Sequence, residues 1–340
     1  MLSKLRYDAR ILTKMTPRRA WNAAKVWSAY QVARVVRKSV QWGLPISISI
    51  EPTTACNLRC PECPSGLRQF TRPTGNLKDA FFRNVIDQVA KHSTFLTFYF
   101  QGEPYINPNF LDMVRYASGK GLFTATSTNA HFLDDANAKA TVESGLDRCI
   151  ISIDGTTQEV YEQYRKEGEL SKVIEGTKNL IRWKKELKSK TPQVVFQFLV
   201  VRPNEHQIEE VKKLGKELGV DEVKFKTAQV YDHEDGNDLI PLNDKYSRYR
   251  KLENGKYQIK NGLSNNCWRL WNACVITWDG KIVPCCFDKD ASHQMGDLEQ
   301  RPFKEIWYNG NYTAFRSKLL DSRKGIDICS NCSEGTKVWT

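Results

Sequence analysis

The stretch Glu51-Pro-Thr-Thr-Ala-Cys56-Asn-Leu-Arg-Cys60-Pro-Glu-Cys63 holds three cysteines in a C-x3-C-x2-C spacing. It directly follows residues 46–50, an apolar run with the composition of a buried strand. Three thiolates at this spacing can bind three irons of a cubane, whereas a closed iron–sulfur cluster takes four cysteines. Structural zinc also needs a fourth ligand, and no Cys or His lies nearby to supply it. The spacing therefore favours an iron–sulfur cluster with one open iron over a zinc site.

Strand-like and helix-like segments alternate after this motif. The strand-like runs are residues 46–50, 95–100, 123–128, 149–153, 194–201 and 222–230, and the helical segments are 77–92, 107–119, 133–145, 158–188 and 204–218. Such alternation indicates parallel strands joined by crossover helices. Six units predict an α/β fold, a partial (β/α)6 TIM-like barrel over residues 44–230. In such barrels the chemistry lies on the loops that follow the strands.

Polar motifs follow three of these strands. Gln101-Gly102-Glu103-Pro104 comes after the second, Ser127-Thr128-Asn129 ends the third, and Ser152-Ile153-Asp154-Gly155 ends the fourth. Each motif by itself also suits an ordinary loop, but their shared position at successive strand ends favours one common site. The candidate cofactor-binding residues are Gly102, Glu103, Ser127, Asn129, Ser152, Asp154 and Arg165.

These motifs resemble those of the radical S-adenosylmethionine (SAM) superfamily, over roughly residues 45–335. The resemblance implies that a 4Fe–4S cluster on Cys56, Cys60 and Cys63 reduces bound SAM to a hydrogen-abstracting 5′-deoxyadenosyl radical. It also implies that Gly102 and Glu103 hold the SAM ammonium group, and that Ser152 and Arg165 hold its carboxylate. Two positions depart from the family pattern: Gln101 replaces a glycine, and Glu62 replaces an aromatic residue near the adenine.

A second group of cysteines lies near the C-terminus, at positions 267, 274, 285, 286, 329 and 332. They flank a predicted hairpin over residues 276–283, with Asp279-Gly280 at its turn. This region, residues 267–340, resembles the SPASM or twitch extension of the superfamily, which holds auxiliary clusters. Six cysteines are too few to close two cubanes, so we expect one auxiliary 4Fe–4S cluster. Its expected ligands are Cys267, Cys285, Cys329 and Cys332, with Cys274 or Cys286 as alternatives for one of them. Zinc also fits the final C-x2-C pair, but the upstream motif favours the iron–sulfur cluster.

The N-terminal arm, residues 1–43, is predicted to be a basic amphipathic helix. Residues 1–41 contain ten Lys or Arg and one acidic residue, in a chain whose net charge is +12. One interpretation places this helix on an anionic membrane surface, and the alternative packs it against the body with its basic stripe in water. Residues 231–266 are predicted to be a polar linker, with the acidic cluster at 232–235 as a solvated loop. The lone Cys149 is predicted to be a buried structural thiol.

The expected function is that of a radical SAM oxidoreductase. A dehydrogenase or maturase reaction on a small molecule or peptide would use the auxiliary cluster as electron acceptor. The alternatives are a peptide maturase that forms a cross-link and an enzyme that modifies RNA. A flavodoxin- or ferredoxin-type protein is the expected electron donor, and no DNA partner is expected because the basic charge is confined to the arm. We expect a cytoplasmic protein, or one peripheral to the inner face of the membrane. No residue is identified as a catalytic base.

Overall fold

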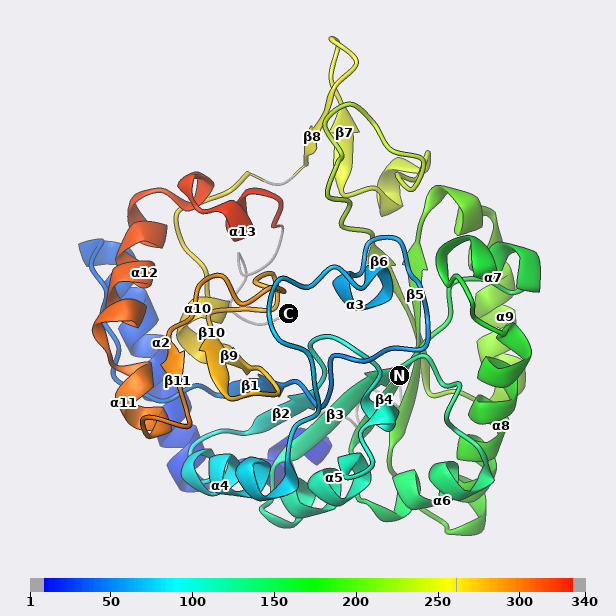
Figure 1. Ribbon diagram of the computed structural model, residues 1–340, viewed down its shortest axis with the longest axis horizontal. Coiled ribbons are helices and arrows are strands. Elements are labelled where there is room, and N and C mark those ends of the chain that lie inside the picture. The colour runs from blue at the N-terminus through cyan, green and yellow to red at the C-terminus, as the bar shows by residue number, and fades with distance from the viewer. Residues whose placement is uncertain (1–8, 261, 333–340) are drawn as a thin grey trace.

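The computed structural model describes residues 9–260 and 262–332, and its centre is a nine-stranded sheet (Figure 1). Its strands are β1 (Ser47–Ile50), β2 (Phe95–Phe98), β3 (Phe123–Thr128), β4 (Arg148–Ser152), β5 (Gln193–Val200), β6 (Glu222–Thr227), β9 (Ala273–Ile276), β10 (Lys281–Val283) and β11 (Gly296–Asp297). Strands β1 to β6 pair in chain order and all in parallel. The sheet does not close from β6 back to β1. This arrangement confirms the predicted partial barrel.

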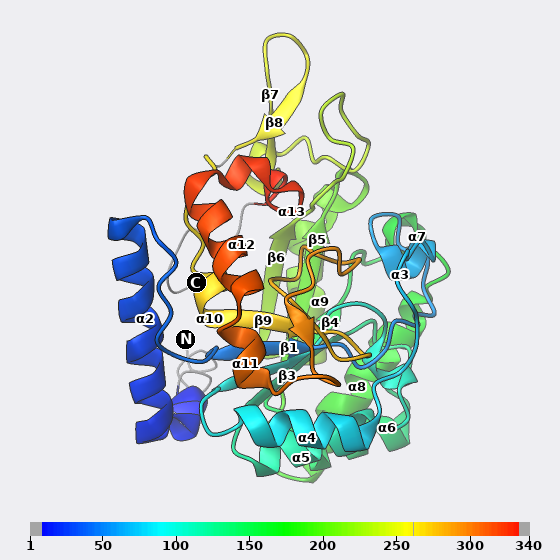
Figure 2. The ribbon, with the colours of Figure 1, turned by 60° about the vertical axis from the view of Figure 1, so that its left-hand side comes forward.

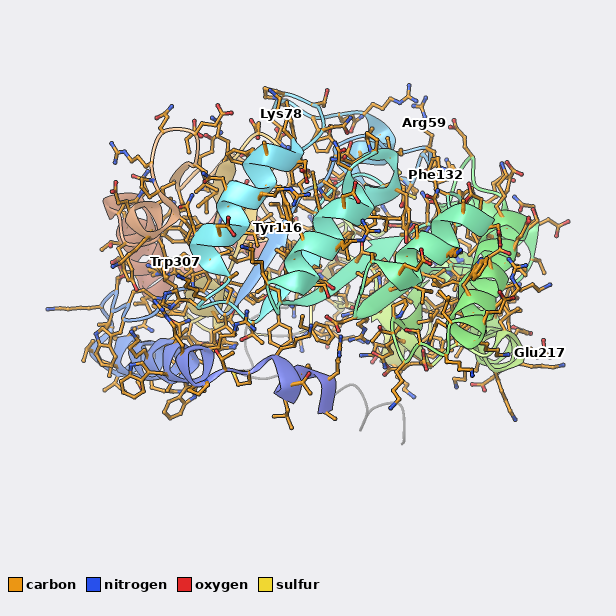
Figure 3. The ribbon with its side chains drawn as sticks, turned by 90° about the horizontal axis from the view of Figure 1, so that it is seen from below. Arg59, Lys78, Tyr116, Phe132, Glu217 and Trp307 are labelled. Atoms are coloured by element: carbon orange, nitrogen blue, oxygen red, sulfur yellow. The ribbon has the colours of Figure 1, made fainter. Side chains whose placement is uncertain are left out.

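The helices that connect these strands lie along the outer side of the sheet. They are α4 (Asp79–Val89), α5 (Phe110–Gly119), α6 (Asp135–Glu143), α7 (Gln158–Tyr164), α8 (Leu170–Glu186) and α9 (Ile208–Leu218). Figure 3, which views the molecule from below, shows α4, α5 and α6 in a row in front of the sheet. The helical segment predicted over 158–188 is divided into two helices, because the chain leaves the first helix at Arg165 and Glu167 adopts a left-handed φ of 64°. The predicted segment 204–218 includes the end of a 3-10 helix, Arg202–Gln207, which precedes α9.

The C-terminal region extends the barrel sheet. Strand β9 pairs in parallel with β1, so that Ser47 lies opposite Ala273, and β10 returns antiparallel to β9. The hairpin turn contains Gly280, whose φ of 84° is readily adopted only by glycine. Around it lie α10 (Arg269–Asn272), α11 (Phe303–Trp307), α12 (Gly310–Asp321) and α13 (Asp327–Ser330). This region therefore shares the sheet of the barrel, although the sequence predicted a small separate domain.

The segment predicted as a polar linker has structure of its own. Strands β7 (Tyr249–Lys251) and β8 (Tyr257–Ile259) form a two-stranded hairpin that projects from the body (Figure 1). A short 3-10 helix, Asp244–Tyr246, precedes it. Tyr249 is buried, and its hydroxyl donates to the Val230 carbonyl at 3.0 Å. These contacts attach the hairpin to the end of the barrel, so part of the segment predicted as a linker is an ordered hairpin.

The N-terminal arm is packed against the body. Helix α2 (Pro17–Val36) lies along one edge of the molecule (Figures 2 and 3). The ring of Tyr30 lies 5.2 Å from that of Trp268 and 5.4 Å from that of Trp271, measured between centroids. Asn22, a polar residue of this helix, is buried. Its side-chain amide donates to the Leu44 carbonyl and accepts from the Leu44 backbone N–H. The arm is thus anchored to the core, and α2 ends at Val36 instead of continuing to residue 43.

One core joins all these parts. Buried side chains of α2, the barrel strands and the C-terminal region belong to a single apolar cluster, which includes Val26, Ile48, Trp271 and Trp307. The described residues include no helix long and apolar enough to cross a membrane. Residues 1–8 and 333–340, which belong to the predicted arm and C-terminal domain, lie outside the described part of the chain.

Candidate radical SAM site

The first three cysteines lie in the loop that leaves β1. Cys60 is buried, and Cys56 and Cys63 are partly buried. Burial raises the pKa of the Cys56 thiol to about 12 and also raises the pKa of Cys60. These thiols therefore stay protonated unless a metal replaces the lost solvation, and a coordinating metal deprotonates thiols outright. Buried thiols with raised pKa values are suited to binding a metal cluster. They are poorly suited to act as reactive cysteines, which are thiolates in contact with water.

The loop after β2 packs directly on the cysteine loop. Gly102 has a φ of 75°, and a Cβ at this position would lie 2.3 Å from the Thr53 carbonyl oxygen. Only glycine therefore fits here. The backbone N–H of Glu103 donates to the Ala55 carbonyl at 2.8 Å. This close approach places the Glu103 carboxyl group beside the thiols.

Glu103 is almost completely buried. Its carboxylate accepts from the Thr128 hydroxyl at 2.7 Å and from the backbone N–H of Asn129 at 2.8 Å. Burial raises the pKa of Glu103 to about 7, although the hydrogen bonds from Asn129 and Thr128 act in the opposite direction. Such a carboxylate is poised to bind a cation, because a nearby positive charge restores its ionised form.

The ends of β3 and β4 meet beside this carboxylate. The hydroxyl oxygens of Ser127 and Ser152 lie 3.5 Å apart, and the Asn129 side chain donates to Asn57 in the cysteine loop at 2.7 Å. The structure therefore brings the predicted residues of three strands to one place.

Arg165 and Asp154 form a buried ion pair behind the cysteines. The Arg165 Nε atom lies 2.5 Å from an Asp154 carboxylate oxygen, and the other oxygen accepts from the backbone N–H of Leu199 at 2.7 Å. An Arg165 Nη atom lies 3.7 Å from the Cys60 sulfur. Both Asp154 oxygens are thus engaged, which makes Asp154 a positioning residue for Arg165.

These groups line one cavity of about 390 Å³. Its walls include the three cysteines and, of the predicted cofactor-binding residues, Gly102, Glu103, Ser127, Asn129, Ser152 and Arg165. Asp154 lies outside the lining. The C-terminal region contributes Cys286 and Phe287, which lie in the loop after β10. The cavity therefore connects the first cysteine group with the C-terminal region.

Three cysteines of the second group, Cys267, Cys329 and Cys332, lie beside the buried side chain of Arg323. Cys285 interacts electrostatically with Cys267 and Cys332, and Cys329 interacts with the same two thiols. Burial raises the pKa of Cys329 to about 12 and also raises the pKa of Cys285 well above its ordinary value. Arg323 donates to the Cys332 sulfur at 3.3 Å. Cys267, Cys329 and Cys332 interact electrostatically with Arg323. Thiols grouped beside a guanidinium have the chemistry of a cluster site, because the cation offsets thiolate charge.

The other cysteines differ in their surroundings. Cys274 lies on β9 and is buried in the apolar core, with Arg316 as the charged group that acts on it. Cys149 is fully buried on β4, and burial raises its pKa to about 12. Cys286 lines the cavity. Among residues 9–260 and 262–332, no three Cys, His, Asp or Glu side chains already form a metal-ligand group.

Sequence reasoning missed several residues of this site. The Gln101 side-chain oxygen lies 3.7 Å from the Cys63 sulfur, at the position where a glycine was expected. Glu62 accepts from the backbone N–H of Tyr231 at 3.1 Å and thereby joins the cysteine loop to the segment after β6. Asp288 accepts from the backbone N–H groups of Ser292 and His293, so its carboxylate holds a loop. No sequence signal marks the pairings of Gln101 with Cys63 or of Glu62 with Tyr231, because the partners lie far apart in the chain.

Two family profiles match the chain. The Radical SAM superfamily profile matches residues 50–215, and the SPASM profile, described as an iron–sulfur cluster-binding domain, matches residues 267–333. This chain belongs to the radical SAM superfamily. As a radical SAM protein it uses SAM and a 4Fe–4S cluster, and its SPASM region binds auxiliary iron–sulfur clusters.

Two curated relatives cover most of the radical SAM chain. The tungsten-containing aldehyde ferredoxin oxidoreductase cofactor-modifying protein of Pyrococcus furiosus is 25% identical over 319 residues, which are 84% of this chain and 86% of the relative. The AdoMet-dependent heme synthase of Methanosarcina barkeri is 24% identical over 325 residues, 85% of this chain and 88% of the relative.

Solved structures share the radical SAM fold. BtrN in complex with AdoMet (SAM) and 2-DOIA is 17% identical with a TM-score of 0.53, and the match covers 87% of this chain and 95% of BtrN. SuiB of Streptococcus suis bound to SAM is 14% identical with a TM-score of 0.63, over 87% of this chain and 73% of SuiB. These likenesses support the fold assignment.

Proposed function

We propose that this protein is a radical SAM oxidoreductase that oxidises a small molecule by two electrons. The observation that carries the proposal is the single cavity of about 390 Å³, because it is lined both by the first cysteine group and by Cys286 of the second group with its neighbour Phe287. A substrate in this cavity would contact both halves of the protein.

The chain would hold its first cluster through Cys56, Cys60 and Cys63, and an auxiliary cluster through Cys267, Cys285, Cys329 and Cys332. When bound, these groups and SAM supply hydrogen abstraction and a place for one further electron. The protein contributes burial, because the cysteine loop is covered by the Gln101–Glu103 segment and by Arg165. A flavodoxin- or ferredoxin-type protein is the proposed electron donor, on the resemblance to the superfamily.

The polar residues of the cavity are arranged to bind an amino acid group. Glu103 presents a buried carboxylate for the SAM ammonium, and Arg165 presents a guanidinium for its carboxylate. Because Asp154 fixes Arg165 in one orientation, little side-chain entropy is lost when the carboxylate binds. Ser152 and Asn129 line the same part of the cavity and offer further hydrogen bonds.

The metal content of ligand variants tests the two-cluster assignment. Anaerobically reconstituted protein is expected to hold about eight irons per chain and to convert SAM to 5′-deoxyadenosine under dithionite. Cys329→Ala should lower the content to about four irons and leave the first cluster in place. Cys274→Ala is the matched control, since Cys274 is a core thiol, and it should keep the full content. Zinc in place of iron, or iron loss in Cys274→Ala, would contradict the ligand assignment.

We also propose that the exposed face of α2 docks on an anionic membrane surface. Trp21 is 67% exposed, Trp27 44% and Val35 82%, all on the side of the helix that faces away from the core. Exposed basic residues flank them, among them Arg18 and Arg34. Exposed aromatic residues beside basic ones suit the interface of a bilayer with anionic headgroups.

Binding to vesicles of phosphatidylglycerol tests this surface. Replacing both Trp21 and Trp27 by alanine should weaken binding about tenfold or more, because burying one large apolar side chain contributes roughly 1.5–3 kcal/mol. Leu242→Ala removes an apolar side chain that is 75% exposed elsewhere, and it should bind as the parent does. Equal binding of all three proteins, or salt-sensitive binding to RNA in place of vesicles, would rule out the membrane proposal.

A further inference from the structure

Four basic side chains besides Arg165 line the cavity. They are Lys226, Arg248, Arg269 and Lys289. Lys226 lies at the end of β6, Arg248 precedes β7, Arg269 begins α10, and Lys289 lies in the loop after β10. The acidic residues of the lining are Glu62 and Glu103. The cavity wall therefore has more basic than acidic side chains, and these basic side chains come from both the barrel and the C-terminal region.

The acidic residues of the wall are already engaged. Glu103 accepts from Thr128 and Asn129, and Glu62 accepts from the backbone of Tyr231. Within the described ranges, Lys226, Arg248 and Lys289 make no ion pair with an acidic side chain. We call these three residues the cationic wall. Arg165 pairs with Asp154, and Arg323 contacts the second cysteine group, so the two cofactor sites have cations of their own.

Arg248 is the member with the most unused hydrogen-bonding capacity. One Nη atom donates to the Thr227 carbonyl at 3.4 Å. Its Nε and its other Nη atom are buried and have no partner among the described residues. Buried donors left unpaired are costly, and a guanidinium fork matches the two oxygens of a carboxylate or phosphate. Nearby, the Lys289 Nζ atom lies 4.8 Å from the ring centroid of Tyr231 and makes a long contact of 3.5 Å with the Glu62 carbonyl.

We infer that the substrate carries an acidic group, a carboxylate or a phosphate, which the cationic wall holds through Arg248 with Lys226 and Lys289. This inference rests on the proposed function, because it assigns the substrate class of the same cavity. The acidic group would bind at the side of the cavity made by the end of β6 and the C-terminal loop. It would thereby orient the rest of the substrate toward the cysteine loop, which lines the same cavity.

Calorimetry on the reconstituted full-length protein with SAM bound tests the inference. The probes are inorganic phosphate and succinate, with glycerol as the neutral comparison at constant ionic strength. Saturable binding of either acid at one site is expected, and the stronger one identifies the preferred acidic group. Arg248→Gln should weaken it at least about tenfold, since it loses a charge-assisted bidentate contact, and Arg248→Lys should recover part of it. Lys318→Gln, which removes an exposed lysine of α12, is the matched control and should bind as the parent does.

Two results would overturn the inference: no saturable binding of either acid, or equal binding by the parent and Arg248→Gln with unchanged iron content. SAM cleavage by the unaltered protein is measured in parallel. Cleavage without an acid-binding site would reject the substrate class only. An acid-binding site without cleavage would instead reject the proposed function.

Discussion

Replacing Cys56, Cys60 and Cys63 together by alanine is expected to abolish dithionite-driven cleavage of SAM and to remove about four irons per chain. The three thiols are the cysteine ligands available in the loop that follows β1, and all three line the cavity. The measurements are the yield of 5′-deoxyadenosine and the iron and sulfide content after anaerobic reconstitution. The second cysteine group should keep about four irons, because it lies in a different part of the sheet.

Cys149→Ala is the matched control for this variant. Cys149 is a fully buried cysteine of β4 that does not line the cavity, so its loss should leave both the iron content and SAM cleavage near those of the parent. Continued cleavage by the triple variant would reject the assignment of the first cluster. Loss of all iron in the triple variant would show that the auxiliary cluster does not assemble without the first cluster.

Arg72→Ala is expected to destabilise the protein by about 3–5 kcal/mol, the largest stability effect we predict for a single side chain. Arg72 binds Glu51 through two contacts of 2.8 and 2.6 Å, and the Glu51 side chain is fully buried. Glu51 also accepts from the backbone N–H of Trp278 at 3.2 Å, and the Arg72 Nε atom donates to the Lys289 carbonyl at 3.0 Å. Without Arg72 the buried carboxylate of Glu51 would lose its charged partner, and the loop after β10 would lose its hydrogen bond from Arg72 to the Lys289 carbonyl.

Urea unfolding of the reconstituted protein, followed by tryptophan fluorescence, measures this effect. The control is Arg115→Ala, which breaks an exposed ion pair with Asp112 and should cost less than about 1 kcal/mol. A cost for Arg72→Ala no larger than that of the control would mean that the buried pair does not join the two regions.

The pH dependence of the Arg72→Ala variant has a definite sign. Burial already raises the pKa of Glu51, and removing Arg72 removes the largest opposing influence. A carboxyl group whose pKa is higher in the folded than in the unfolded state stabilises the fold less as pH rises. The loss in free energy of unfolding of Arg72→Ala, relative to the parent, should therefore be smaller near about pH 5 than near about pH 8. Adding Glu51→Gln should recover part of the lost stability at the higher pH.

Local patterns predicted most of the barrel and much of the site. The runs predicted at 95–100 and 123–128 contain strands β2 (Phe95–Phe98) and β3 (Phe123–Thr128), because apolar periodicity reflects the burial of a strand. The polar motifs meet at one edge because parallel strands place all their carboxyl ends together. The break at Arg165 was not predicted, since residues 158–188 have helical periodicity throughout. The turn there is held by tertiary contacts of Arg165 with Asp154 and Cys60.

By itself the sequence determined the cysteine spacing, the alternation of strands and helices, and the Asp279-Gly280 turn, because these depend on residues close together in the chain. Only the tertiary structure decided that β9 joins the sheet beside β1 and that Glu51 pairs with Arg72. It also decided that Lys226, Arg248 and Lys289 share one cavity. The physical reason is that a lone charge in a sequence gives no sign of its partner. Which charges meet is set by how the core packs, and therefore by many weak contacts between distant segments.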